Sequence, residues 1–143
     1  AVADAFAGTE EQIDAVMCGN DGLAGYVIRS LSERQLAGDV VVVGQDADLE
    51  ACQRIVEGTQ AMTVFKPIND LAKEAAECTV KLAKGEQITG DLLDASDVKE
   101  NEDGQKVPYY GLEPVAVTKE NMDRVIISSG FHSREEVYLN VEN

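Results

Sequence analysis

Four consecutive valines, Val40–Val43, constrain the fold of this chain more than any other feature. β-Branched residues favour strands, and an unbroken apolar run is typical of a strand with both faces covered. The run ends at Gly44, Gln45 and Asp46. We therefore expect Val40–Val43 to lie inside a parallel sheet with helices on both faces, and Asp46 to follow at the carboxyl end of the strand.

The segments on either side of the valines alternate between strand and helix patterns. Apolar runs in 13–20 and 60–67 predict two further strands, and the three- to four-residue apolar spacing of 21–35 and 48–58 predicts helices between them. Such alternation predicts an α/β fold with a parallel sheet and right-handed crossovers. The residues expected to face inward are Leu23, Val27, Ile28 and Leu31 on the first helix and Leu49, Cys52, Ile55 and Val56 on the second, which Gly58 is expected to end.

The pattern changes after Pro67, which is the one candidate domain boundary, between 1–66 and 67–143. A helix is predicted for 68–86, with Leu71, Ala75, Cys78 and Leu82 on one stripe and Gly85 at its end. A hairpin-like segment follows, with its acidic turn at 101–104. A last helix is expected between Thr118, as its N-cap, and Gly130.

Composition excludes several classes of function. The 12 Lys and Arg against 27 Asp and Glu give a net charge of −15, which repels nucleic acids and anionic lipid surfaces. No apolar run is long enough for membrane insertion, and the opening segment lacks the pattern of a signal peptide. We expect a soluble chain that contacts neither nucleic acid nor the membrane interior.

The sequence indicates neither a metal nor a catalytic centre. Cys18, Cys52 and Cys78 form no Cys-x-x-Cys pair and are expected to be unreactive thiols, and the single histidine, His132, is expected to be structural. The acidic segment 94–103 does not match a calcium loop and is expected to be a solvated turn. No nucleophile has an evident base, and the Gly-x-Gly-x-x-Gly turn of an oxidoreductase is missing, so we expect no enzyme activity and no cofactor.

Polar side chains follow each of the three predicted strands. Asn20, Asp46 and Lys66 would meet at one edge of the sheet, in the crevice where open parallel sheets bind ligands. An amide, a carboxylate and an ammonium suit vicinal hydroxyls, whereas Asp46 would repel a phosphate. Each residue also has a structural alternative. Asn20 or Asp21 could cap the first helix, Lys66 could be a solvated loop cation, and Asp46 could cap the second helix, although Asp48 is better placed to do so.

Three segments, IDAVMCGNDGLAG, VVVVGQDADLEACQRIVEGTQAMTVFKPI and NMDRVIISSGFH, carry a family resemblance. Together they resemble the carboxyl-terminal half of the sugar-binding proteins of bacterial ABC transporters, in the ribose- and galactose-binding superfamily, and most of all the D-xylose-binding proteins. The resemblance implies a Rossmann-like lobe of a type I periplasmic binding protein. It also implies that Asn20, Asp46 and Lys66 bind sugar hydroxyls and that Gln45 lines the cleft.

The resemblance further implies a non-catalytic protein that binds a monosaccharide, xylose or a similar aldopyranose, and delivers it to an ABC transporter permease. The location would be extracytoplasmic, in the periplasm or on a cell-surface lipoprotein. Residues 1–66 would belong to the carboxyl-terminal lobe, and 67–143 would cross the hinge near Lys66–Pro67 to the other lobe and return. Members are about twice as long, so the chain would hold half a site and pair with a missing N-terminal half or self-associate. The alternative is a sugar-sensing module of a receptor or of a lactose-repressor-type regulator.

Overall fold

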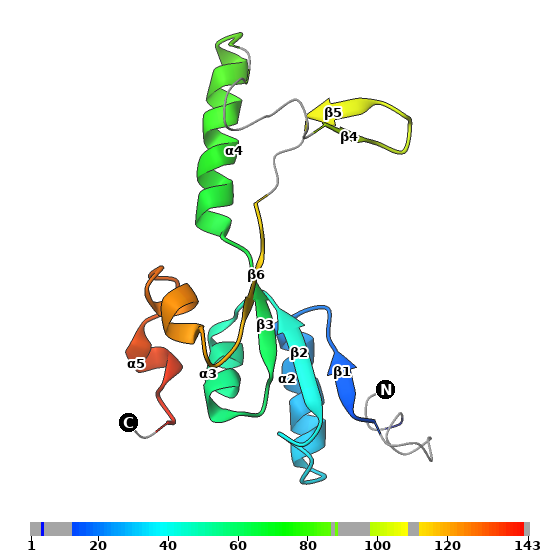
Figure 1. Ribbon diagram of the computed structural model, residues 1–143, viewed down its shortest axis with the longest axis vertical. Coiled ribbons are helices and arrows are strands. Elements are labelled where there is room, and N and C mark those ends of the chain that lie inside the picture. The colour runs from blue at the N-terminus through cyan, green and yellow to red at the C-terminus, as the bar shows by residue number, and fades with distance from the viewer. Residues whose placement is uncertain (1–3, 5–12, 87, 89–97, 109–111, 142–143) are drawn as a thin grey trace. The chain divides into compact units, whose positions relative to one another are not determined.

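The computed structural model describes residue 4 and residues 13–86, 88, 98–108 and 112–141 (Figure 1). The chain divides into two compact units, one made of Ala1–Lys66 with Pro114–Asn143 and the other of Pro67–Glu113. Each unit is described by itself.

The first unit contains a four-stranded sheet in the order β1-β2-β3-β6. β1 (Ala15–Met17), β2 (Val41–Gln45) and β3 (Met62–Phe65) pair in parallel, and β6 (Val115–Val117) pairs antiparallel with β3. The predicted α/β class and the parallel pairing of the first three strands are confirmed. β6 was not foreseen as a partner of β3, because the sequence around it predicts a local hairpin.

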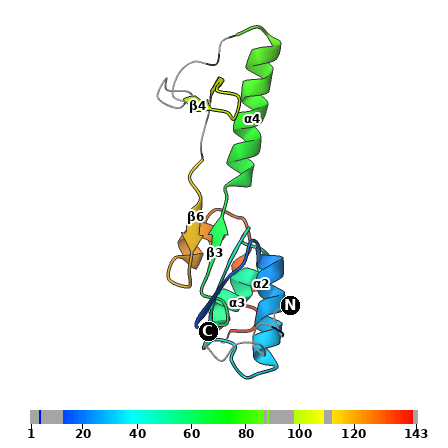
Figure 2. The ribbon, with the colours of Figure 1, turned by 90° about the vertical axis from the view of Figure 1, so that its right-hand side faces the viewer.

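Two helices pack on one face of this sheet, as Figures 1 and 2 show: α2 (Asp21–Ser32) and α3 (Leu49–Glu57). α2 buries Ala24, Val27, Ile28 and Leu31. The expectation that Leu23 faces inward is wrong, because Leu23 is 54% exposed. α3 ends at Gly58, whose φ of 95° is the left-handed conformation that glycine adopts most easily.

Alternate residues of the strands point to the opposite face, which the described residues leave partly open. In β2, Val42 is buried, whereas Val41 is 48% exposed. Met17 on β1 is 88% exposed. The prediction that the valine strand is covered on both faces is therefore wrong for the part of the chain that the structure describes.

The segment after β6 packs against α3 and completes the larger core. It contains a π-helix, η1 (Asp123–Ile127), and a short helix, α5 (Arg134–Val137). Thr118 does not cap this helix, because Met122 directly precedes η1 and the Thr118 hydroxyl instead donates to Glu120. α5 begins with a capping box between Ser133 and Glu136. The buried apolar residues of this core are Ala47, Cys52, Ile55, Val56, Phe65, Val117, Met122, Ile126 and Val137.

The second unit consists of α4 (Ile68–Ala83) and a hairpin of β4 (Val98–Glu100) and β5 (Lys106–Pro108). The hairpin and its turn at 101–104 confirm the prediction. None of the residues of α4 is buried, and Leu71 and Leu82 of its predicted apolar stripe are more than half exposed. Of this stripe only Cys78 is partly buried, so among the described residues the stripe does not enter a core.

Candidate functional site

Asn20, Asp46 and Lys66 follow the carboxyl ends of three adjacent parallel strands, β1, β2 and β3. The structure brings two of them into contact: Lys66 Nζ lies 2.6 Å from Asp46 Oδ1. The two side chains are 46% and 39% exposed, so the ion pair remains open to solvent and to a ligand. A carboxylate and an ammonium held together offer a pair of acceptor and donor sites to neighbouring hydroxyls.

Asn20 caps α2, which is the structural role that the sequence left open. Its Oδ1 accepts a hydrogen bond of 2.8 Å from the backbone N–H of Leu23. Among the described residues its Nδ2 group makes no hydrogen bond, so one end of the amide fixes the side chain and the other can donate. Capping and ligand binding are therefore compatible at this position.

Gln45 lies at the end of β2 with its side chain half-buried. It contributes to a depression of about 310 Å³ on the open face of the sheet. Gln45 directly precedes Asp46 at the carboxyl end of β2, and it also lines the open face of the sheet. The depression is lined by Met17, Cys18, Gly19, Val43, Gly44, Gln45, Met62 and Val64.

The backbone at Asp46 is in a conformation that non-glycine residues seldom adopt. Asp46 has a φ of 106° and Ala47 a φ of 56°, and both lie in the left-handed region. Such a conformation costs on the order of 1–3 kcal/mol per residue and persists only where surrounding contacts impose it. The segment Asp46–Asp48, which we call the acidic loop, is therefore held in place by its neighbours.

Asp21 is the residue that the sequence interpretation missed. The sequence predicts a helix cap at this position, but Asp21 is 1% exposed and its carboxylate accepts hydrogen bonds from Gln60, Thr63 and the backbone N–H of Asp48. Because Asp21 follows Asn20 directly, this contact with Asp48 joins the end of β1 to the acidic loop after β2. No sequence motif marks the arrangement.

The electrostatic character of this edge is acidic. Burial, followed by the neighbouring charges of Asp21, Asp46 and Glu50, raises the pKa of Asp48 above its ordinary value. Lys66 is paired with Asp46 and so does not leave a free positive charge for an anion. This balance suits a neutral, hydroxyl-rich ligand better than a phosphate.

The other expectations about reactive groups can be compared with the described residues. Cys18, Cys52 and Cys78 are free, and burial raises the pKa of Cys52 to about 12, which makes this thiol a poor nucleophile. The described residues hold no cluster of three or more His, Cys, Asp or Glu that could bind a metal ion. Residues 94–97 of the acidic segment lie outside the described chain, and none of the described helices is long and apolar enough to cross a membrane.

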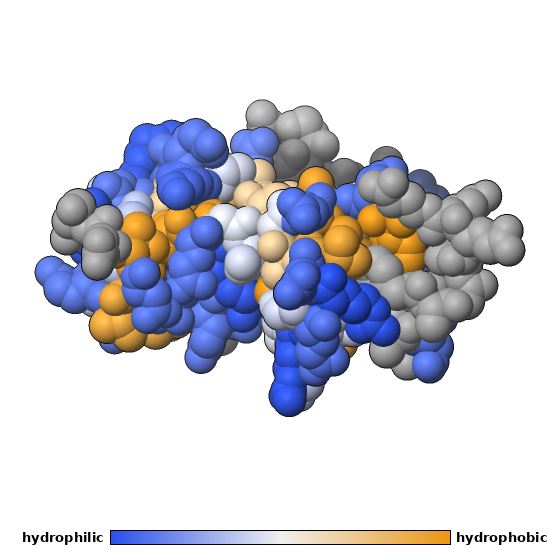
Figure 3. Space-filling view, turned by 90° about the horizontal axis from the view of Figure 1, so that it is seen from below, coloured by the Kyte–Doolittle hydropathy of each residue, from blue (hydrophilic) through white to orange (hydrophobic). Residues whose placement is uncertain are grey.

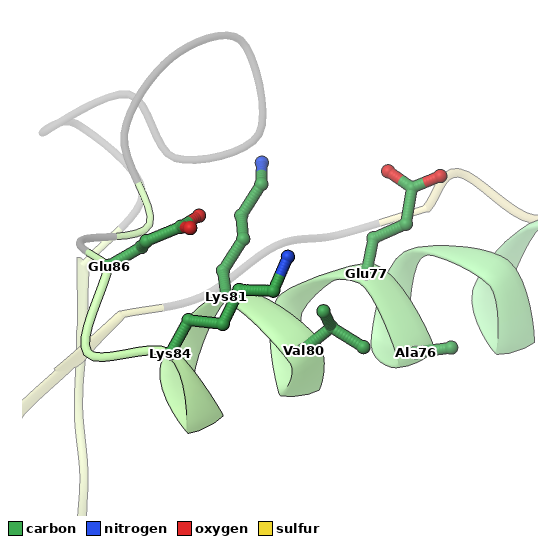
Figure 4. Close-up of a pocket in the computed structure, with 6 residues that line it drawn as sticks. All are labelled: Ala76, Glu77, Val80, Lys81, Lys84 and Glu86. Atoms are coloured by element: carbon green, nitrogen blue, oxygen red, sulfur yellow. The ribbon is translucent and has the colours of Figure 1, made fainter.

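A second hollow, of about 380 Å³, lies along α4 in the other unit (Figure 4). Figure 4 shows Glu77 and Lys81 on one side of Val80, with Lys84 and Glu86 at the end of the helix. Two acidic and two basic side chains line this exposed surface, and none of the predicted site residues contributes to it. The sheet edge, not this hollow, carries the converging polar groups.

Residues 1–87 match the family model described as periplasmic binding protein domain. The chain belongs to the periplasmic binding protein family. This match covers β1, β2 and β3 and therefore all four residues that the sequence proposed for the site.

Two similar members of the family are named D-xylose-binding periplasmic protein. The one from Haemophilus influenzae is 43% identical over 135 residues, and the one from Escherichia coli is 40% identical over 134 residues. Each alignment covers 94% of this periplasmic binding protein chain but only 39% of the relative. The chain therefore spans about two fifths of the length of these relatives.

Solved structures agree with the fold and the family. A carbohydrate transporter solute binding protein from Chloroflexus aurantiacus, in complex with D-glucose, has a TM-score of 0.74 and 28% identity, and the match covers 94% of this chain and 38% of that one. An ABC transporter solute binding protein from Clostridium phytofermentans, with bound β-D-glucose, has a TM-score of 0.73 and 26% identity and covers 94% and 42%. Relatives of both kinds are sugar-binding proteins, as the sequence resemblance implied.

Proposed function

We propose that this chain supplies part of the binding site for a monosaccharide, xylose or a similar aldopyranose, in a protein that delivers the sugar to an ABC transporter permease. The observation that carries the proposal is the Asp46–Lys66 ion pair at the carboxyl edge of the parallel sheet, in a chain 43% identical to a D-xylose-binding periplasmic protein. The names of the relatives describe binding and not catalysis, which supports a non-enzymatic role.

Each proposed residue has a chemical role toward the sugar. Asp46 accepts hydrogen bonds from two adjacent hydroxyls, and Lys66 donates to a hydroxyl or ring oxygen while holding the carboxylate in place. Asn20 donates through Nδ2, since its Oδ1 is occupied by the cap. Gln45 contributes at the margin of the cleft.

The proposed site is incomplete within this chain. Relatives are more than twice as long, and we propose that a second lobe closes over the sugar about a hinge near Lys66–Pro67. Residues 1–66 would belong to one lobe, and 67–143 would cross and return. A missing N-terminal half, or a second copy of the chain, would cover the open face of the sheet, and the location would be extracytoplasmic, in the periplasm or on a surface lipoprotein.

A sensing role is the second candidate. A relative from Rhizobium radiobacter, 31% identical over 134 residues, is named multiple sugar-binding periplasmic receptor. The site would bind sugar in the same way, but the bound protein would contact a signalling partner instead of a permease. The higher identity of the two D-xylose-binding proteins favours transport.

A chimera tests the proposal, in which this chain replaces the matched 39% of the Haemophilus influenzae relative. Titration calorimetry with D-xylose should show one saturable site. D-Ribose, D-glucose and the phosphate ester xylose 5-phosphate serve as comparisons, and the phosphate should bind worst because Asp46 repels it. A folded chimera that binds none of the three neutral sugars would contradict the proposal.

A further inference from the structure

The acidic loop needs external contacts to keep its backbone in the left-handed region. Two consecutive non-glycine residues with positive φ would relax in a free peptide, since the cost is on the order of 1–3 kcal/mol each. The Asp46 carboxylate points where it does only while the loop keeps this shape. Whatever holds the loop therefore also sets the direction of the Asp46 carboxylate, which we propose binds the sugar.

The backbone groups of the acidic loop make hydrogen bonds to β3, to His132 and to Asp21. The N–H of Asp46 donates to the carbonyl of Val64 at 2.9 Å, and the N–H of Ala47 donates to Thr63 Oγ1 at 3.1 Å. The carbonyl of Ala47 lies 2.8 Å from His132 Nε2. The N–H of Asp48 donates to Asp21 Oδ2 at 3.1 Å.

Asp21 connects these contacts. Its Oδ2 also accepts from Thr63 Oγ1 at 2.7 Å, so a single oxygen holds Asp48 directly and Ala47 through the threonine hydroxyl. Its Oδ1 accepts from Gln60 Nε2 at 2.9 Å, and Arg54 fixes the glutamine by donating from Nε to Gln60 Oε1 at 3.0 Å. Arg54 Nη2 also donates to the backbone carbonyl of Asp21 at 3.1 Å.

A buried carboxylate is costly unless its oxygens are hydrogen-bonded, so the donors around Asp21 decide what an acid does at this position. Asp21 is 1% exposed, and Asn20 already caps α2, which removes helix capping as the reason for an acid at position 21. Three donors converge on the two oxygens of Asp21, and only an acceptor-only group satisfies all of them.

We propose that Asp21 is a positioning residue for sugar binding, which fixes the acidic loop and thereby aims the Asp46 carboxylate at the ligand. It does so through Asp48 and, by way of Thr63, through Ala47, and it does not itself contact the sugar. The role in binding rests on the proposed function, whereas the effect on the loop does not.

Asp21→Asn is the direct test in the 143-residue chain. An asparagine keeps the size but turns one acceptor into a donor, which must face Gln60 Nε2, Thr63 or the N–H of Asp48. We expect hydrogen exchange at the Asp48 amide to accelerate about ten- to hundredfold, the range for losing a hydrogen bond to a charged group. The Cα and Cβ chemical shifts of Asp46 and Ala47 should move away from left-handed values, while amides in α2 such as Leu31 keep their protection.

Asp39→Asn is the matched control, because Asp39 is exposed and loses the same charge without touching the loop. If Asp21→Asn does not fold, Thr63→Val removes the hydroxyl that joins Asp21 to Ala47 and retains the carboxylate. It should shift the Asp46 and Ala47 signals in the same direction. Loop shifts and Asp48 exchange that match the wild-type chain, in either folded variant, overturn the proposal.

The binding arm uses the chimera described above. Asp21→Asn should weaken D-xylose binding about ten- to hundredfold at a temperature where the variant is fully folded, and Asp39→Asn should leave it unchanged. A wild-type chimera that binds no sugar defeats the proposed function, and the loop measurements then still decide whether Asp21 positions Asp46. A chimera whose sugar affinity survives Asp21→Asn overturns the positioning role alone.

Discussion

Gly44 lies in β2 beside the buried carboxylate of Asp21. A Cβ at position 44 would lie 2.2 Å from Asp21 Oδ1 and 3.1 Å from Gln60 Nε2, so an alanine would push the two hydrogen-bonded groups apart. We expect Gly44→Ala to lower the free energy of unfolding by about 1–3 kcal/mol or more, since this is the usual cost of overpacking a core. Denaturant unfolding followed by circular dichroism measures the change.

Gly19→Ala is the control for this prediction, because no heavy atom lies within 4 Å of a Cβ at position 19. Its unfolding free energy should stay within about 0.5 kcal/mol of the wild-type value, as for most surface substitutions. Equal stability of the two alanine variants would show that Asp21 can move without cost.

Sequence reasoning located the edge of the candidate site but not the residues that support it. Asn20, Asp46 and Lys66 could be predicted to share one edge because each follows a strand of a parallel sheet. The role of Asp21 could not, since its partners Gln60 and Thr63 lie 39 and 42 residues away in the chain. Local rules offered only a cap for the Asn-Asp pair, and Asn20 alone fills that role.

At the scale of elements, Asp123 joins η1 to α5. Its carboxylate accepts hydrogen bonds from Arg134 and, at 2.9 Å, from the hydroxyl of Tyr138. The bond from Arg134, followed by that from Tyr138, lowers the pKa of Asp123 below its ordinary value of 3.8. The ionised form is therefore favoured in the folded chain, and its stabilising effect is present above that pH.

Asp123→Asn should be less stable than the wild-type chain near neutral pH. The sign follows from the lowered pKa: the stabilisation is lost as the pH falls below about 3.8 and through the folded-state pKa. Thermal unfolding from pH 7 down to pH 2.5 should show a gap in midpoint that closes at the acid end. A gap that is constant across this range would contradict the assignment.

The elements themselves show what a periodic pattern can and cannot predict. α2, α3 and β2 follow from the apolar spacing within each segment, and the end of α3 follows from Gly58, because these signals are local to the segment. The pairing of β6 with β3 depends on residues about 50 positions apart, as in Thr63↔Val117, and no local pattern reveals it. α5 could have been found, since Ser133 and Glu136 form the spacing of a capping box.

At the scale of the molecule, the open sheet face and the greater length of the relatives both favour the proposal that a further part of the protein covers this face. Figure 3 shows apolar surface exposed between hydrophilic side chains on the side seen from below. Met17 and Val41 supply apolar surface on the open face, and this chain spans 39% of its D-xylose-binding relatives. An exposed apolar face of this kind is typical of a protein interaction site, which fits the proposal of a second lobe.

The isolated chain should therefore bind sugar at least about a thousandfold more weakly than the chimera, because the proposed site also takes contacts from a second lobe. NMR titration with D-xylose up to about 100 mM measures such weak binding. Micromolar affinity in the isolated monomer would contradict the proposal that it holds only part of a site.

The central claim is that the Asp46 carboxylate binds a sugar hydroxyl. Titration calorimetry of D-xylose into the chimera, with Asp46→Ala beside the exposed control Asp39→Ala, tests it most directly. The account predicts that Asp46→Ala weakens binding by about 1.5–3 kcal/mol, as for a hydrogen bond to a charged group, while Asp39→Ala has little effect. Unchanged affinity in a folded Asp46→Ala chimera would contradict it.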